Sequence, residues 1–227
     1  MTNVTFLAHS GFLVETEDLL LLFDWWKGTL PPLPPEKPLL VFVSHGHHDH
    51  FTPAVFTLDD GGRPVRFLLG EGITPPASHD CTVLRGGESA ALPEAAVETL
   101  PSTDEGVAFL VTCGGRTIYH AGDLNWWHWE GEPDPWNPRM EADFKRYTEP
   151  LRRRRLDLAF LPLDPRQQSA ESWGFTYLME LADVRRAFPM HQWDDYAPTD
   201  RLLSVRPDLW DRVVPVSREG QRWSFPD

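Results

Sequence analysis

Short apolar runs, separated by glycine, proline and acidic residues, dominate the first half of the chain. Runs of this length bounded by turn residues are typical of β-strands. The pattern predicts strands at Val4–Ala8, Phe12–Glu15, Leu19–Phe23, Leu39–Val43, Val65–Leu69, Thr82–Leu84 and Ala96–Leu100. It then predicts a hairpin from Val107–Val111 and Thr117–Tyr119, and later strands at Leu156–Leu161 and Phe188–His191. The proline-rich segment Gly28–Pro38 excludes a helix and predicts a stiff surface connection.

Apolar positions return at helical spacing in the second half, at Met140, Phe144, Tyr147 and Leu151. This spacing predicts a helix over Met140–Arg155. Its basic tail, Arg152–Arg155, resembles a nucleic-acid patch, but the helix dipole also favours cations in a last turn, and we prefer that interpretation. Other helices are predicted at Thr52–Leu58, which begins with a capping threonine and a proline, and at Ser172–Ala187. Pro198–Val205 and Arg212–Val216 are expected to close the domain.

Composition limits the class of protein. With 227 residues, 41% of them hydrophobic, we expect residues 1–227 to form a single α/β domain. The formal charge of −13 argues against nucleic acid as a partner, because attraction to a polyanion depends on lysine and arginine. No apolar run is long enough to span a bilayer and the start, Met1–Phe6, lacks the features of a signal peptide, so we expect no membrane association and a cytoplasmic location. Two cysteines are too few for a disulfide framework.

The segment Ser44–His50 carries the clearest chemistry. It follows the apolar run Leu39–Val43 and holds His45, His47, Asp49 and His50. Imidazole nitrogens and a carboxylate in this spacing are metal-ligand chemistry, suited to zinc, iron or manganese, whereas the alternative is a histidine-rich solvated turn. A loop after a strand directs alternate side chains to one point, so His45 and His47 are expected to share one ion while Asp49 and His50 serve a neighbouring one.

The pattern His45-x-His47-x-Asp49-His50 resembles the signature of the metallo-β-lactamase-fold hydrolase superfamily. Gly122-Asp123 resembles the family segment whose aspartate bridges two metals, and His191 resembles the late histidine ligand. The opening His9-Ser10-Gly11-Phe12 is most similar to the branch that includes L-ascorbate-6-phosphate lactonase. The resemblance implies a four-layer αββα sandwich, an α/β (α+β) fold in which two mixed sheets face each other, helices lie outside and loops at one edge hold the metals.

The resemblance also implies two metal sites of unequal completeness. Asp49, His50, Asp123 and His191 supply every expected ligand of one site. His45 and His47 form the other, but Ser102 stands where the family usually has a third histidine. A hydroxyl is a poor zinc ligand, so that site recruits Asp104 or Glu105, keeps a water, or loses its ion. The alternative role for these loop carboxylates is to cap the next strand.

Three further features are candidates for substrate binding. Trp126 and Trp127 belong to a tryptophan-rich segment, Leu124–Trp136, which is expected to form a wall over the metals, or else a subunit interface or core patch. Arg166 occupies a loop that borders the active site in the resembled branch and is a candidate anion clamp, the alternative being a surface ion pair. His9, at the first turn, is either a group at the edge of the site or an ordinary turn histidine.

These expectations combine into a metal-dependent hydrolase that acts on a small-molecule lactone, ester or phosphodiester. One or two Zn²⁺ ions, with Mn²⁺ or iron fitting the same donors, would lower the pKa of a water to give hydroxide, which Asp49 would orient as a catalytic residue. Two alternatives stay open. One is a mononuclear metal-binding protein or pseudo-enzyme whose tryptophan-rich surface serves a partner, including a second copy of the chain, and the other is an iron redox protein.

Overall fold

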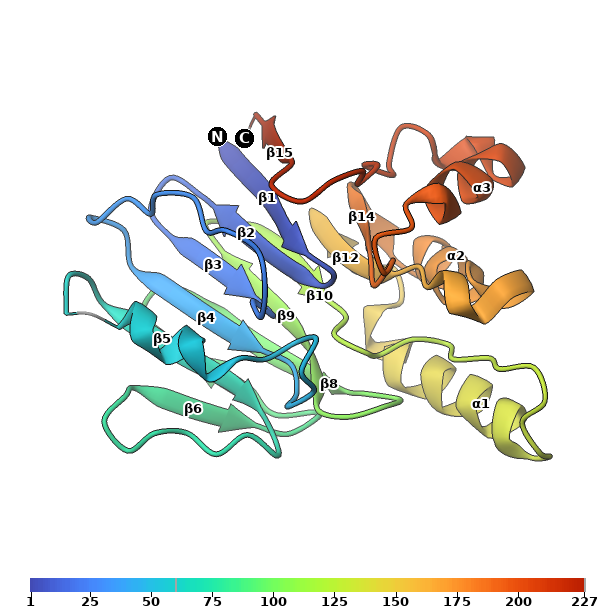
Figure 1. The fold of residues 1–227 in the computed structure, drawn as a ribbon, viewed down its shortest axis with the longest axis horizontal. Helices are drawn as coiled ribbons and strands as arrows, with labels where there is room; N and C mark the ends of the chain where they lie inside the picture. Colours follow the sequence, from blue (N-terminus) through green and yellow to red (C-terminus); the bar gives the residue numbers. More distant parts are fainter. Residues whose placement is uncertain (60, 227) are drawn as a thin grey trace.

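Two β-sheets pack face to face in the computed structural model, which describes residues 1–59 and 61–226 (Figure 1). The first sheet has the strand order β15-β1-β2-β3-β4-β5-β6. Its strands are β1 (Thr2–Ala8), β2 (Gly11–Glu15), β3 (Leu20–Phe23), β4 (Leu39–Val43), β5 (Val65–Gly70), β6 (Cys81–Leu84) and β15 (Arg222–Phe225). The second sheet has the order β14-β12-β10-β9-β8-β7. Its strands are β7 (Ser89–Ala91), β8 (Ala96–Pro101), β9 (Val107–Cys113), β10 (Arg116–His120), β12 (Leu158–Pro162) and β14 (Ala187–Met190).

The direction of the strands gathers several loops at one edge of the sandwich. In the first sheet, β3, β4, β5 and β6 are mutually parallel, and β1 runs the same way because two antiparallel pairings separate it from β3. In the second sheet, β10, β12 and β14 are parallel. Parallel strands end at the same edge and need crossover connections, which here are the proline-rich segment and the stretch that contains η1 (Pro53–Leu58). The segments that follow β1, β4, β10, β12 and β14 therefore come together.

The core between the sheets is aromatic. Phe12 packs on Phe160 with ring centroids 4.3 Å apart, and Phe23 stacks on Phe42 at 4.7 Å. Phe109 reaches Phe42 from the second sheet at 5.2 Å. All five side chains are fully buried. Each buried phenylalanine contributes about 2–3 kcal/mol, so this stack fixes how the two sheets face each other.

The outer layers differ on the two sides. The three α-helices α1 (Trp136–Thr148), α2 (Trp173–Leu181) and α3 (Ala197–Val205) lie together beside β12 and β14 (Figure 1). The outer face of the first sheet is instead covered by η1, through Val55 and Phe56, and by Leu30 and Leu33 of the proline-rich segment. The predicted two-sheet sandwich is confirmed, but on this side a 3₁₀ helix and an irregular chain take the place of α-helices. None of the helices in the described part of the chain is long and apolar enough to cross a bilayer.

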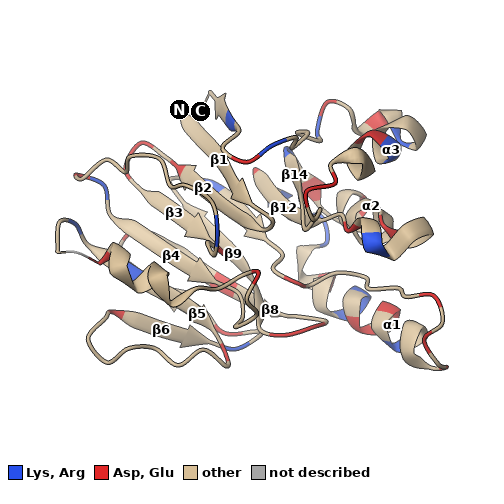
Figure 2. Ribbon diagram, in the orientation of Figure 1, with Lys and Arg blue, Asp and Glu red and all other residues tan. Residues whose placement is uncertain are grey.

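The predicted helix over Met140–Arg155 is displaced and shorter. It begins at Trp136 and ends at Thr148, because Pro150 cannot continue a regular helix, and a 3₁₀ turn, η2 (Glu149–Leu151), follows. Arg152–Arg155 lies beyond the helix, so the helix-dipole interpretation was wrong. Arg152 pairs with Glu149, Arg154 with Glu98 and Arg155 with Asp157. Figure 2 shows residues of both charges interspersed along α1.

Three other boundaries were wrong in the sequence-based prediction. The helix expected at Ser172–Ala187 stops at Leu181, and the chain goes on as β13 (Asp183–Val184), which pairs with β11 (Arg155–Leu156), and then as β14. The short strand β7, with the sequence Ser-Ala-Ala, was missed altogether. The edge of the first sheet is closed by β15, paired antiparallel with β1, and not by Arg212–Val216, of which Val213 makes only an isolated bridge to Ala187. Pairing with strands distant in the sequence determines the secondary structure of these segments, because their own hydrophobic patterns are weak.

Close packing around Ser44 holds the histidine segment against the second sheet. The Ser44 carbonyl accepts a hydrogen bond from the backbone N–H of Val107 at 3.1 Å. A Cβ at Gly106 would lie 2.0 Å from that carbonyl oxygen, and Gly106 also has a φ of +66°. A Cβ at Gly122 would lie 2.8 Å from the Ser44 Cβ. Side chains at these two positions would push the loop that precedes His45 outward.

We therefore expect Gly106→Ala to lower the free energy of unfolding by about 2–4 kcal/mol, because backbone strain and the steric clash add. Gly114→Ala is the matched control, since Gly114 has a φ of +53° but no atom within 4 Å of the added carbon. It should cost only about 1 kcal/mol in the same urea titration. Equal losses of unfolding free energy in the two variants would show that the close contact with Ser44 is not the reason why position 106 requires glycine.

Candidate metal centre

The Asp123 carboxylate lies at the centre of the site, where three histidine side chains face it. His50 Nε2 is 3.1 Å and His191 Nε2 is 3.3 Å from Asp123 Oδ1. His45 Nε2 is 3.5 Å from Asp123 Oδ2. All four residues are buried. They follow β10, β4 and β14, so strands from both sheets deliver them to one point.

A second carboxylate fixes the orientation of His50. Asp24, which follows β3 and is buried, accepts hydrogen bonds from the backbone N–H of Ser44, from the Ser44 hydroxyl and from His50 Nδ1, each at 2.7 Å. Burial raises the pKa of Asp24, but the His120 and His50 imidazoles outweigh it and hold the pKa below its usual value. An ionised Asp24 requires His50 to carry its proton on Nδ1. Nε2 therefore faces Asp123 and is the nitrogen available to a metal ion, as in a metal-ligating histidine.

His191 and His45 are oriented in the same way. Asp164, after β12, accepts from His191 Nδ1 at 2.8 Å. Burial opposes ionisation of Asp164, but the hydrogen bonds from His191 and Arg166 prevail and lower its pKa to about 2. His45 Nδ1 lies 2.9 Å from the Ser44 hydroxyl oxygen, whose proton goes to Asp24, so this nitrogen is the donor. In each of these histidines, Nε2 is the ring nitrogen that faces Asp123.

The electrostatics leave the donors in forms that bind cations. Burial raises the pKa of Asp123, but the His50 and His191 imidazoles outweigh it and hold that pKa well below its usual range. Burial lowers the pKa of His50, but Asp123 and Asp24 reverse the direction and raise it well above its usual value. Burial, and then the neighbouring His50, lower the pKa of His45 to about 4. The two carboxylates thus favour positive charge beside His50, and a divalent cation would supply it.

Nine buried side-chain polar atoms lack a hydrogen-bond partner within the described residues, and three of them lie together at the centre: His9 Nε2, His50 Nε2 and Asp123 Oδ1. Buried polar atoms are otherwise almost always satisfied, so their grouping indicates an ion. The donor atoms form three overlapping groups that could each hold a metal: His9, Asp49, His50 and His191; His45, His50 and Asp123; and His47, Asp104 and Asp123. Imidazole and carboxylate donors of this kind fit zinc, manganese or iron. The structure thus brings together every residue predicted as a metal ligand.

The loop from Ser102 to Gly106 lies beside the less buried part of the centre. The Ser102 hydroxyl accepts a hydrogen bond from the backbone N–H of Asp104 at 3.1 Å. Asp104 belongs to one of the donor groups, with His47 and Asp123. Loss of water around it, and then the charge of Asp123, raise the pKa of Asp104. Glu105 Oε2 lies 3.6 Å from His47 Nε2. Of the two carboxylates considered from the sequence, Asp104 is the better placed.

A cavity of about 620 Å³ opens onto the centre. It is lined by donors of the centre, by Met140 and Arg166, and by the indoles of Trp127, Trp129, Trp136 and Trp193. Trp127 is held by a hydrogen bond from its indole N–H to the Asp123 carbonyl at 2.9 Å and stacks on Trp129 with centroids 5.8 Å apart. Asp49 and His191 also face the cavity. The tryptophan-rich segment is thus part of the wall that was predicted.

Trp126 is a correction to the predicted wall. It does not line this cavity but packs against Phe144 of α1 and Trp173 of α2, with centroids 6.2 and 5.5 Å away. Adjacent residues in an extended segment point to opposite sides, so Trp127 and Trp126 cannot both face the metals. Trp126 fixes the wall segment to the helices instead.

Arg166 both forms an ion pair and borders the cavity, which are the structural features of the two roles considered from the sequence. Its guanidinium pairs with Asp164 through Nε and Nη2, and it also lies over Trp193 at 4.6 Å while lining the cavity. Its side chain is 49% exposed, so it stays accessible to a ligand. The anion-clamp role remains a prediction.

Sequence reasoning missed Asp24, Asp164 and Trp193 as parts of the site. Asp24 directly follows a predicted strand, and Asp123 also lies close after one. This position at the end of a strand was the sequence feature that could have identified Asp24. Asp164 lies two residues before Arg166 in a segment already associated with the site. Trp193 follows His191 by two residues and packs on His9 with centroids 4.5 Å apart. Nothing in the local sequence distinguishes it from the other exposed tryptophans.

Comparison with known proteins agrees with this geometry. Residues 3–128 match the family described as beta-lactamase superfamily domain. The chain therefore belongs to the metallo-β-lactamase-fold superfamily. A metal-dependent hydrolase from Desulforamulus reducens is 30% identical over 140 residues, which are 53% of this chain and 61% of that protein. The match thus spans about three fifths of the length of this curated relative.

Solved structures support the fold over the whole chain. Igni18, a metallo hydrolase from the archaeon Ignicoccus hospitalis, superposes with a TM-score of 0.65 at 17% identity and covers 99% of both chains. CmlA, a diiron β-hydroxylase from Streptomyces venezuelae, has a TM-score of 0.58 at 13% identity over 99% of this chain and 54% of its own. Because the same fold holds iron in one of these proteins, the fold does not select the metal.

Asp24→Asn should weaken the affinity of the metal-stripped protein for Zn²⁺ by 10- to 100-fold, because an amide cannot hold the His50 proton on Nδ1 while it also accepts from Ser44. Competition with a chromophoric chelator measures the affinity. Asp157→Asn is the control. Asp157 also accepts a backbone N–H, from Thr117 at 2.9 Å, but it lies before β12, at the other end of the strands. Equal weakening in both variants would argue against the orienting role of Asp24.

Asp104→Ala should remove a weaker second binding event in calorimetric titration of the metal-stripped protein and leave the tight one unchanged. The reason is that His47 would lose the partner carboxylate that compensates for the missing histidine. Ser102→His should tighten the second event by adding a nitrogen donor. Glu105→Ala is the comparison and should have the smaller effect. Two equally tight sites in both wild type and Asp104→Ala would show that Asp104 is not a ligand.

Proposed function

We propose that this protein is a metal-dependent hydrolase that cleaves a lactone, ester or phosphodiester bond of a small molecule. The main support is one observation: a convergent set of imidazole and carboxylate donors, oriented by buried carboxylates, opens onto a single cavity of about 620 Å³. Cavities of about 300–1,000 Å³ are typical of sites for small molecules. The relatives that are named metal-dependent hydrolases agree with this class of reaction.

Each group of residues has a distinct role in the proposal. Asp49, His50, Asp123 and His191 would hold one ion, and His45, His47 and Asp104 would hold a second, with the Asp123 carboxylate available to both. When bound, such ions supply Lewis acidity, which activates a water and polarises the attacked carbonyl or phosphoryl oxygen. Asp49 lies at the cavity wall with a side chain 11% exposed, where it orients the water and accepts its proton. Zinc is the metal we propose first.

The walls of the cavity suit a substrate with an apolar body and an anionic group. Trp127 and Trp129 present stacked indole faces that exclude water and pack on apolar or ring-shaped groups. Arg166 is fixed by Asp164 and by the Trp193 ring, and it presents the rest of its guanidinium to the cavity. An arginine held in this way loses little side-chain entropy when it binds a carboxylate or phosphate. The tryptophans thus serve the pocket in this proposal, rather than a protein partner.

The test is a screen of lactones, carboxylic esters and phosphodiesters with protein stripped of metal and reloaded with Zn²⁺ or Mn²⁺. Reloaded protein should turn over members of one class, and chelation should abolish the activity. Asp49→Asn should lower kcat by roughly 100-fold or more, because an amide cannot accept the proton. Asp80→Asn, at an exposed carboxylate paired with Arg66 at 2.9 Å, is the control and should keep wild-type rates. Absence of turnover in all three classes, or turnover that survives chelation, would contradict the proposal.

A further inference from the structure

His9 occupies an unusual position for a turn histidine. It lies in the turn between β1 and β2 with a φ of +54°, a backbone conformation that non-glycine residues adopt at a cost. Its side chain is nevertheless buried, and its carbonyl accepts the backbone N–H of His191 at 3.2 Å. The turn is therefore tied to the loop that delivers a metal ligand, and its strained backbone directs an imidazole inward.

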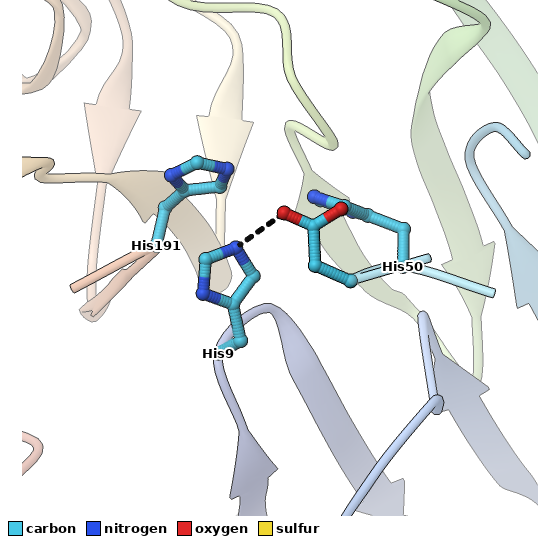
Figure 3. Close-up of side chains that lie close together, drawn as sticks. His9, His50 and His191 are labelled. Carbon is cyan, nitrogen blue, oxygen red and sulfur yellow. Dashed lines mark ion pairs between the residues drawn. The ribbon is translucent and has the colours of Figure 1, made fainter. Parts of the chain in front are cut away.

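The imidazole of His9 lies among the ligands of the more buried ion. Its ring centroid is 4.1 Å from that of His191 and 5.5 Å from that of His50, and its Nε2 lies 3.5 Å from Asp49 Oδ2. Figure 3 shows His9, His50 and His191 meeting from three separate segments, with the dashed line marking the ion pair of His9. Donor atoms of all four residues lie within 4.8 Å of one another.

The unsatisfied ring nitrogen distinguishes His9 from a structural histidine. His120 is also fully buried near the centre, but its Nε2 lies 2.8 Å from the Ser10 carbonyl and its Nδ1 accepts from the backbone N–H of Gly122 at 3.2 Å. His9 Nε2 is buried and has no hydrogen-bond partner among the described residues. A buried imidazole nitrogen that has no partner, and that lies beside a carboxylate and two further imidazoles, has the surroundings of a metal ligand.

We propose that His9 is a protein ligand of the ion held by Asp49, His50, Asp123 and His191. Five bonds of about 2.1 Å to one ion would place neighbouring donor atoms roughly 3.0–3.6 Å apart. The separations of 3.1, 3.3 and 3.5 Å within this group agree with that spacing. The inference deepens the proposed function. Five protein ligands would nearly enclose this ion, and the cavity reaches the centre beside His47 and Asp104, where water and substrate would enter.

The test measures binding of Co²⁺ to the metal-stripped protein, because the d–d absorption of Co²⁺ reports the number and type of its ligands. His9→Gln should weaken the tight site by roughly 100-fold and change the band intensity. His9→Gly should do the same while it relieves the positive φ, and the space it leaves suits a free imidazole. Added imidazole should then restore the spectrum and the affinity in His9→Gly but not in wild type. His48→Gln, at an exposed neighbouring histidine outside the donor groups, is the control.

Two results would overturn the assignment. One is a wild-type Co²⁺ spectrum and affinity in His9→Gln. The other is an equal loss of melting temperature with and without metal in His9→Gly that imidazole does not rescue, which indicates packing alone. Wild-type protein that binds no Co²⁺ would instead contradict the proposed metal centre itself. Since none of these readouts uses turnover, failure of the hydrolase proposal in the substrate screen leaves the His9 assignment standing.

Discussion

A buried aspartate surrounded by histidines is the constraint on which the rest of this structure depends. Asp123 is 4% exposed and faces His45, His50 and His191 within 3.5 Å. An isolated carboxylate in such a place would be very costly, and it is stable only with opposite charge or a cation beside it. The polar layer around it, from Asp24 through Ser44 to Asp164, has one common effect, since it directs each histidine's free nitrogen toward that carboxylate.

The sandwich makes this arrangement possible through strand direction. The first sheet contributes the segments after β1, β3 and β4, and the second contributes those after β10, β12 and β14, all at one edge. The aromatic stack between the sheets sets their relative position, and glycines at 106 and 122 allow the Ser44 backbone to approach the second sheet closely. Packing far from the chemistry therefore controls the distances within the metal centre.

The two halves of the centre differ in burial, and this difference has a functional meaning. His9, His50 and His191 are buried, whereas the side chain of His47 is 43% exposed and Asp104 is exposed. A buried, ligand-rich half would hold an ion tightly, and that binding would stabilise the fold. An open half with fewer protein ligands keeps positions free for exchange with solvent and substrate. Ser102 offers no nitrogen donor to the open half, which adds to this asymmetry.

The sequence by itself determined most of the strands and the candidate ligands His45, His47, Asp49 and His50, because turn residues between apolar runs and the spacing of these ligands are local properties. The two-sheet fold was expected only from the resemblance of that motif to a known superfamily. The sequence could not determine which neighbours orient those ligands. Asp24 lies 26 residues before His50, and Asp164 lies 27 residues before His191, and only the folded sheets bring each pair together. The directions of Trp126 and Trp127, and the inward turn of His9, depend likewise on packing against elements distant in the chain. Local pattern specifies which groups are available, but long-range strand pairing decides which of them meet.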